Sequence, residues 1–191
     1  MLGRGRVVPP GPRSSAIRLQ ARDEPFGDLV DEGLIPGLDQ YLVHFASKGA
    51  LDIDTLGEKN VEALVEAGLV NDLADIYKLT KDDLLQLERF AEISAQKLID
   101  AIAAKKQPVL ERFLFGLGIR HVGAQTAIDL SNKFESIEKL MVATIDELRE
   151  VDGVGEIVAE SIVAWFADED NVTLLEKFAD LGVTQIGRAH V

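Results

Sequence analysis

One pattern of side chains recurs four times in this chain, and the length of the repeat limits the fold more than any other feature. Aligned on four positions that we call the anchors, Gly57, Ala91, Gly123 and Gly155, the copies begin 34, 32 and 32 residues apart. In each copy apolar residues lie four residues and one residue before the anchor, and apolar or small residues follow it at positions +4 and +7. A repeat of this length is typical of stacked supersecondary units.

The spacing inside each copy predicts a turn that leads directly into an amphipathic helix. Positions +4 and +7 lie on one face of a helix, and they hold Val61 and Leu64 in the first copy and Ala159 and Ile162 in the fourth. The small residue at +4 allows two helices to approach closely. No strand pattern is evident. We therefore predict an all-α fold, in which four tandem helical hairpins form a compact domain and the second helix of each begins just after its anchor.

The fourth turn, with Gly153 and Gly155, has the features of an anion-binding site. Two glycines allow backbone angles closed to other residues, and they leave main-chain N–H groups uncovered. The start of a helix also presents unpaired N–H donors and the positive end of the helix dipole. The alternative is that the glycines only turn and cap a helical scaffold. Four copies in register favour anion binding, because a helical solenoid needs no glycine at the entry of every second helix.

The formal charge of −13 argues against binding to a polyanion unless the acidic residues lie away from the contact surface. Residues 112–128 contain no acidic residue, and they include the third hairpin with Arg120 and His121. The other three copies carry Glu58, Glu92 and Glu156 just after the anchor, where a carboxylate stabilises the helix dipole. We predict that the third hairpin binds phosphate best.

Other chemistry is less well supported by the sequence. The absence of cysteine excludes disulfides and cysteine-based zinc sites, and three scattered histidines do not predict a metal site. No apolar run approaches the ~18 residues of a transmembrane helix, so we expect a soluble, cytoplasmic protein with no membrane partner. We expect Trp165 and Phe166 to lie in the core instead of stacking on bases, and His44 to pack beside Phe45.

The chain divides into three parts. Residues 1–40 are rich in Gly, Pro, Ser and Arg without an apolar period, which predicts a disordered or non-native segment. Prolines at positions 9, 10 and 12 argue against a mitochondrial presequence there. Residues 41–183 are the predicted helical domain, with halves at about 41–106 and 107–183, and residues 184–191 are expected to be an unrelated tail.

Particular residues, beyond the repeat, resemble bacterial NAD-dependent DNA ligases. They are residues 44–53 (HFASKGALDI), 56–59 (LGEK), 68–70 (GLV) and 74–80 (ADIYKLT). Residues 112–123 (RFLFGLGIRHVG) are similar to one of the most recognisable stretches of that family. The resemblance covers about residues 41–183 and corresponds to the helix-hairpin-helix domain of these enzymes.

The resemblance implies a module that binds nicked or duplex DNA through its phosphate backbone, within an enzyme that seals nicks during replication and repair with NAD as the adenylyl source. In the second hairpin, Arg89 and Ala91 replace the glycines of the family pattern, so main-chain access is poorer there. Carried over by position, the DNA contacts would be Gly57, Lys59, Ala91, Arg120, His121, Gly123, Gly153 and Gly155.

The chain departs from the family in what it lacks. It has no Lys-x-Asp-Gly motif for adenylation, no four-cysteine zinc site before the hairpins and no BRCT-like part after them. The resemblance therefore implies a fragment that is inactive alone and holds no cofactor. NAD, magnesium and structural zinc would belong to other domains of the same parent protein, which are also expected partners. The alternative is a free-standing, non-enzymatic helix-hairpin-helix protein that binds DNA or serves as a scaffold.

Overall fold

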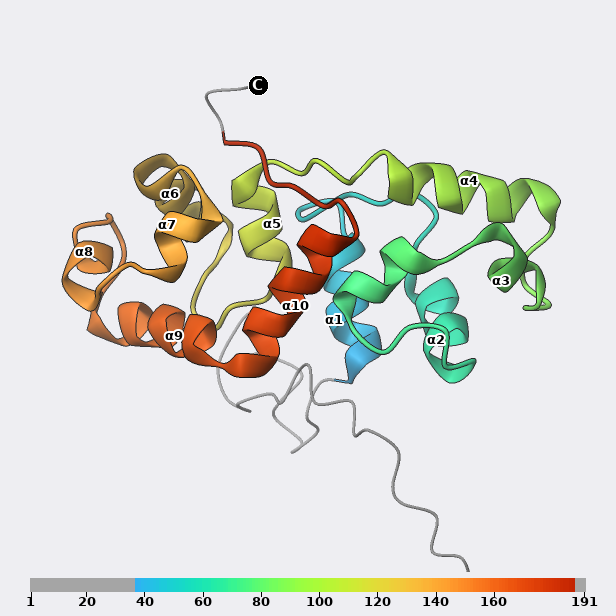
Figure 1. The fold of residues 1–191 in the computed structure, drawn as a ribbon, viewed down its shortest axis with the longest axis horizontal. Coiled ribbons are helices and arrows are strands. Elements are labelled where there is room, and N and C mark those ends of the chain that lie inside the picture. Colours follow the sequence, from blue (N-terminus) through green and yellow to red (C-terminus); the bar gives the residue numbers. More distant parts are fainter. Residues whose placement is uncertain (1–36, 188–191) are drawn as a thin grey trace, which may run out of the picture.

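The computed structural model describes residues 37–187, and this part of the chain is helical (Figure 1). Its elements are α1 (Leu38–Ala46), α2 (Glu58–Glu66), the 3₁₀ helix η1 (Leu73–Lys78), α3 (Lys81–Leu85), α4 (Glu92–Ala103), α5 (Leu110–Gly116), α6 (Ala124–Phe134), α7 (Ile137–Met141), α8 (Ile145–Arg149), α9 (Glu156–Ala167) and α10 (Glu169–Asp180). Within the described residues no strand forms, and a single bridge pairs Val109 with Ile186. The all-α prediction is confirmed.

Four helix pairs pack against each other in chain order: α1 with α2, α3 with α4, α5 with α6, and α8 with α9. We number these pairs hairpins 1 to 4. The residues at +4 and +7 of every anchor are buried, as the repeat predicts, and they are Val61, Leu64, Ala95, Leu98, Ala127, Leu130, Ala159 and Ile162. The sequence repeat is therefore a structural repeat.

Hairpins 2 and 4 begin with the same capping motif. The Thr80 hydroxyl accepts a hydrogen bond from the main-chain N–H of Asp83, and the Asp83 carboxylate accepts one from the N–H of Thr80. Thr144 and Glu147 make the same reciprocal pair at the start of α8. Each pair satisfies two donors that a helix start leaves unpaired, which explains how helices of only five residues are defined.

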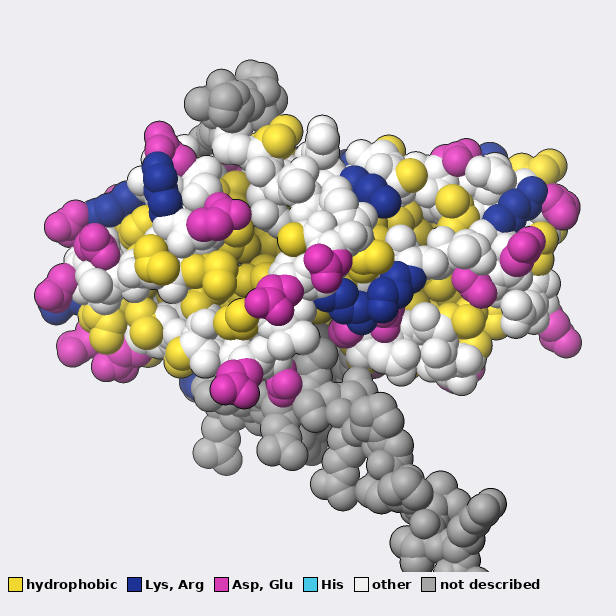
Figure 2. Space-filling model, viewed as in Figure 1, with side chains coloured by type: hydrophobic (Ala, Val, Ile, Leu, Met, Phe, Trp, Pro, Cys, Tyr) yellow, Lys and Arg dark blue, Asp and Glu magenta, His cyan; other side chains and the backbone are white. Residues whose placement is uncertain are grey.

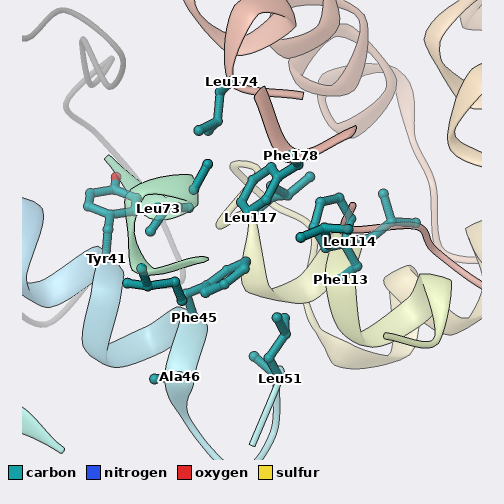
Figure 3. Close-up of a cluster of buried hydrophobic side chains, with 14 of the residues drawn as sticks. Tyr41, Phe45, Ala46, Leu51, Leu73, Phe113, Leu114, Leu117, Leu174 and Phe178 are labelled. Atoms are coloured by element: carbon teal, nitrogen blue, oxygen red, sulfur yellow. The ribbon is translucent and has the colours of Figure 1, made fainter. Parts of the chain in front are cut away.

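Helix α10 crosses the centre of the molecule, between hairpins 1 and 2 on one side and hairpins 3 and 4 on the other (Figure 1). Its Phe178 is fully buried. The Phe178 ring centroid lies 5.6 Å from that of Phe45 in α1 and 5.1 Å from that of Phe113 in α5. Figure 3 shows these three rings meeting between their helices. One continuous core therefore joins the two predicted halves.

A close approach of α1 and α5 strengthens the same junction. A Cβ atom on Gly116 would lie 3.1 Å from side-chain carbons of both Phe45 and Leu51. Glycine at this position lets the end of α5 pack directly on hairpin 1. His44 belongs to this contact too, because its Nε2 lies 2.8 Å from the carbonyl oxygen of Phe115 and its ring packs edge-on against the Phe115 ring. His44 lies in the last turn of α1, beside Phe45 in sequence, and the ring it contacts is that of Phe115 in α5.

The ends of the described chain extend the predicted domain slightly. Helix α1 starts at Leu38, inside the segment expected to be disordered, while residues 1–36 lie outside the described part. Thr184 and Ile186 donate main-chain hydrogen bonds to the carbonyls of Lys106 and Pro108, and Leu110 donates one to Ile186. These pairs attach residues 184–186, expected to be a tail, to the segment that joins the two halves. Residues 188–191, including His190, lie outside the described part.

Candidate nucleic-acid interface

The four hairpins share one turn, closed by a hydrogen bond between the two apolar positions before the anchor. The residue at −1 donates its main-chain N–H to the carbonyl of the residue at −4, at 3.3, 3.0, 3.0 and 3.1 Å in chain order. The pairs are Leu56 with Ile53, Phe90 with Leu87, Val122 with Ile119, and Val154 with Val151. These apolar side chains hold each turn on the core, so the anchor that follows is turned outward.

Every anchor is the N-cap residue of the second helix in its hairpin, as predicted. The backbone angles of Gly57 (φ −87°, ψ 175°), Gly123 (φ −81°, ψ 179°) and Gly155 (φ −83°, ψ −178°) are nearly identical. None of the three receives a side-chain cap. The first N–H groups of α2, α6 and α9 therefore have no capping side chain, and they lie beside an exposed anchor at the positive end of the helix dipole.

The glycines at these turns leave open space above the backbone. A Cβ atom on Gly57, Gly123, Gly153 or Gly155 would meet no atom of the described chain within 4 Å. Only Gly153 has a positive φ, at +75°. The expectation that both glycines of the fourth turn adopt angles closed to other residues was correct for Gly153 and wrong for Gly155, because the N-cap position is extended backbone that any residue can adopt.

Hairpin 2 differs in the way its sequence suggested. The N–H of its anchor, Ala91, donates to the Ser94 hydroxyl oxygen at 2.9 Å, and that hydroxyl donates to the Ala91 carbonyl at 3.0 Å. A side chain of the same helix therefore already occupies the donor that is free at the glycine anchors. Arg89, two residues before the anchor, is exposed. At this anchor a methyl group therefore stands where the other hairpins have none, and Ser94 takes the Ala91 N–H, while the start of α4 itself has no side-chain cap.

Hairpin 3 brings together Arg120, His121 and Gly123 at one turn. His121 adopts left-handed backbone, with φ 64°, at the position that Gly153 occupies in hairpin 4. The side chains of Arg120 and His121 are half-buried, and Gly123 is exposed. Arg112 is directed elsewhere, since its guanidinium lies 3.3 and 3.4 Å from the carbonyl oxygens of Lys48 and Ala50. The acid-free stretch therefore supplies two basic side chains to the turn, while its third basic residue links hairpin 3 to hairpin 1.

The residue two positions after the anchor (+2) is polar in two hairpins and apolar in the other two, a difference not predicted from the sequence. Lys59 and Gln125 occupy it in hairpins 1 and 3, whereas hairpins 2 and 4 carry isoleucines that are 73% and 68% exposed, Ile93 and Ile157. The sequence contained a signal for this difference, because position +2 does not lie on the buried helix face formed by positions +4 and +7. An apolar residue there is therefore expected to be exposed. One hairpin in each half thus presents a polar side chain beside its helix start.

Carboxylates surround these turns unevenly. Glu58, Glu92 and Glu156 lie in the first turns of α2, α4 and α9, as expected for residues that stabilise a helix dipole, while the first turn of α6 contains no acidic residue. Figure 2 shows acidic side chains gathered over α8 and α9, at the hairpin 4 end of the molecule. Among the uncapped helix starts, that of hairpin 3 is the least opposed by negative charge.

The two aromatic residues that follow hairpin 4 lie in or against the core. Phe166 is buried and Trp165 packs against the core at half exposure, so neither forms an open stacking surface. Within residues 37–187, no cluster of three or more His, Asp or Glu side chains could hold a metal ion. No helix in that range is long and apolar enough to cross a bilayer.

Comparison with known proteins agrees with the geometry of the hairpins. Residues 48–104 match the family described as a SAM-like helix-hairpin-helix tandem, and residues 112–175 match the helix-hairpin-helix motif family. The chain is 49% identical over 142 residues to a DNA ligase of Bacillus cytotoxicus, and 50% identical over 142 residues to one of Gemmatimonas aurantiaca. It carries a helix-hairpin-helix region homologous to DNA ligases.

The matched part covers 74% of this chain but only 21% of each of those two relatives. A DNA ligase of Trichlorobacter lovleyi is 47% identical over 148 residues, which is 78% of this chain and 22% of the relative. The chain therefore spans about a fifth of the length of these ligases. The helix-hairpin-helix region contains neither a Lys-x-Asp-Gly motif nor a cysteine, so its residues fit neither adenylation by NAD nor a cysteine-based zinc site.

Proposed function

We propose that this helix-hairpin-helix region binds duplex DNA through its phosphate backbone and serves as the DNA-holding module of a bacterial, cytoplasmic, NAD-dependent DNA ligase. The observation that carries the proposal is the threefold repetition of one geometry. Three helices of nine residues or more begin at an exposed glycine with extended backbone, no side-chain cap and open space above it. Such a helix start binds an anion through main-chain N–H groups.

Under this proposal the contacts at Gly57, Gly123, Gly153 and Gly155 are made by the main chain, which carries no information about base sequence. Lys59, Arg120 and His121 add side-chain donors beside them. Ala91 contributes least, because its N–H is already bonded to Ser94. The nicked strand would be sealed by NAD-dependent chemistry that no residue of this chain performs, with other domains of the same enzyme as partners.

Fluorescence anisotropy of the 191-residue chain with nicked duplex, intact duplex and single-stranded DNA over a salt series tests the proposal. We expect duplex binding that is independent of sequence and that weakens steeply as salt rises, because bound phosphates release counterions. Arg120→Glu should weaken binding to every duplex. The matched control is Lys97→Glu, the same charge change at an exposed position six residues beyond an anchor.

Two results would contradict the proposal. If the chain fails to bind duplex DNA even at low salt, the hairpins serve packing alone and the scaffold interpretation replaces ours. If Arg120→Glu affects binding to some sequences and not others, recognition involves bases and not only the backbone.

A further inference from the structure

A hollow on the surface lies between hairpins 1 and 2. It is lined by Thr55, Gly57, Glu58, Lys59, Asn60 and Arg89. Five of these residues surround the start of α2, and the sixth comes from the turn of hairpin 2. Arg89 therefore extends from the turn with the poorest main-chain access to the helix start of the neighbouring hairpin.

Two hydrogen bonds in series connect Arg89 to the turn of hairpin 1. The Arg89 Nε donates to the Asn60 side-chain oxygen at 3.4 Å. Asn60 in turn donates from Nδ2 to the main-chain carbonyl of Thr55 at 2.7 Å, so its amide is fixed on the turn of hairpin 1. A guanidinium that uses Nε–H in this way still has both terminal NH₂ groups, whose spacing matches two oxygens of one phosphate.

The two cations of the hollow are not neutralised within the described chain. Six lysines form ion pairs there, namely Lys78, Lys81, Lys105, Lys133, Lys139 and Lys177. No ion pair joins Lys59 or Arg89 to any carboxylate of residues 37–187, although Glu58 lines the same hollow. In a chain of charge −13, two unpaired cations beside an uncapped helix start favour an anion as the missing partner.

We propose that this hollow binds one phosphate of the DNA backbone, held jointly by Arg89, Lys59 and the start of α2. Hairpin 2 then contributes a guanidinium to the site of hairpin 1, while the Ala91 N–H in its own turn is bonded to Ser94. Asn60 acts as a positioning residue, since it orients Arg89 and does not touch the phosphate. The inference rests on the proposed function. It adds Arg89, which the sequence comparison treated only as a departure from the glycine pattern.

Arg89→Gln is the variant that tests the site. Glutamine is neutral, yet its amide can still donate to Asn60, so the contact between hairpins is retained. With a short nicked duplex we expect affinity at low salt to fall roughly tenfold, as for loss of a charged hydrogen bond. The slope of log affinity against log salt should fall by about 0.9, because one counterion fewer is released. Arg89→Lys should keep the slope and lose part of the affinity, and Lys97→Gln should change neither.

A double-mutant cycle separates positioning from direct contact. Asn60→Ala should weaken binding in the wild-type background and have no further effect in the Arg89→Gln background. Thermal unfolding of each variant by circular dichroism provides the folding control. If Arg89 only links the hairpins, its variants change the melting temperature and leave the salt slope intact.

The possible outcomes are distinguishable. Wild-type binding that Arg120→Glu weakens and Arg89→Gln leaves unchanged overturns this inference and leaves the proposed function standing. Absence of wild-type binding overturns the proposed function itself. Competition by inorganic phosphate at concentrations that leave DNA binding to Arg89→Gln unaffected would identify the hollow as a site for free phosphate instead of a DNA phosphodiester.

Discussion

At the scale of single residues, the glycines of the hairpin turns have two different roles. Gly153 has left-handed backbone, a conformation that costs other residues free energy. Gly155, two residues later, has extended backbone with open space above it. Glycine at position 155 is therefore unnecessary for the fold, and its value lies in leaving the N–H groups of α9 accessible.

Serine substitutions at these two positions should have opposite effects on stability. Gly155→Ser places a preferred capping residue at an N-cap, so the free energy of unfolding should rise by about 0.5 kcal/mol. Gly153→Ser forces a side chain into left-handed backbone and should lower it by about 1 kcal/mol. Urea denaturation of both variants measures the difference.

The effect of Gly155→Ser on DNA binding should be opposite to its effect on stability. Gly155→Ser should weaken duplex binding although the protein is more stable, because the serine hydroxyl takes the N–H groups that phosphate would use. Anisotropy at low salt measures this effect, with Gly182→Ser, at a positive-φ glycine distant in sequence from the anchors, as a control for destabilisation alone. A Gly155→Ser variant that binds as tightly as wild type would show that these amides do not contact DNA.

At the scale of helices, α10 is held on η1 by a nearly buried ionic cluster as well as by Phe178. The Lys177 ammonium contacts the carboxylates of Asp72 and, at 2.6 Å, Asp75. Both carboxylates are about one-tenth exposed. Burial opposes the charged form of each group, but the hydrogen bonds between them outweigh it, so the pKa of Lys177 is raised and the pKa of Asp75 is lowered.

Lys177→Met should be strongly destabilising, since it leaves the nearly buried Asp72 without a cation and Asp75 with Lys78 alone. We expect the free energy of unfolding at neutral pH to fall by about 3 kcal/mol. Lys139→Met is the matched control, because it breaks an exposed pair with Glu135 that is worth about 0.5 kcal/mol. Equal losses in the two variants would contradict a structural role for the cluster.

The stability of the two proteins should depend on pH to different extents. In the wild type the pKa of Asp75 is lower in the folded state, so its stabilising contribution is complete above the unfolded pKa of about 4 and is lost as the pH falls through the folded value. Without Lys177, Asp75 loses one of the hydrogen bonds that lower its pKa and keeps those from Lys78 and the Asn71 N–H. The stability difference between Lys177→Met and wild type should therefore shrink on acidification, which urea denaturation at neutral and acidic pH measures.

The elements themselves were largely predictable from the sequence, because the repeat fixes where each second helix begins and which residues it buries. The anchors Gly57, Ala91, Gly123 and Gly155 all became N-caps. The repeat could not reveal contacts between copies, such as Arg89 with Asn60 or Lys177 with Asp72, since these depend on tertiary arrangement. The repeat also did not predict the left-handed backbone of Thr55 and His121, since the turn imposes this conformation and the residue types do not.

At the scale of the whole molecule, the two tandem halves share one core. Phe178 touches Phe45 and Tyr77 from the first half and Phe113 from the second. The main-chain pairing of residues 184–186 with residues 106–110 attaches the end of the described chain to the segment between the halves. The halves therefore have a fixed relative position, which a backbone-binding protein needs if several hairpins are to contact one duplex together.

Phe178→Ala should both destabilise the protein and uncouple its halves. Truncation of a fully buried phenylalanine is expected to cost about 4 kcal/mol. In the wild type, unfolding followed by the fluorescence of Trp165, in the second half, should coincide with hydrogen exchange of α4 in the first half. In Phe178→Ala the two transitions should separate, and if they remain coincident, the junction is held by contacts other than this ring.

The capping arrangement at the anchors also bears on how such repeats diverge. A copy of the hairpin that is no longer selected for binding can acquire a hydroxyl near its helix start and gain stability. Selection for folding then does not oppose the loss of binding. The second copy already has such a hydroxyl, that of Ser94, which accepts the Ala91 N–H. Surveys of variants scored by thermal stability would rank such changes as improvements, and they would miss that a contact surface had been lost.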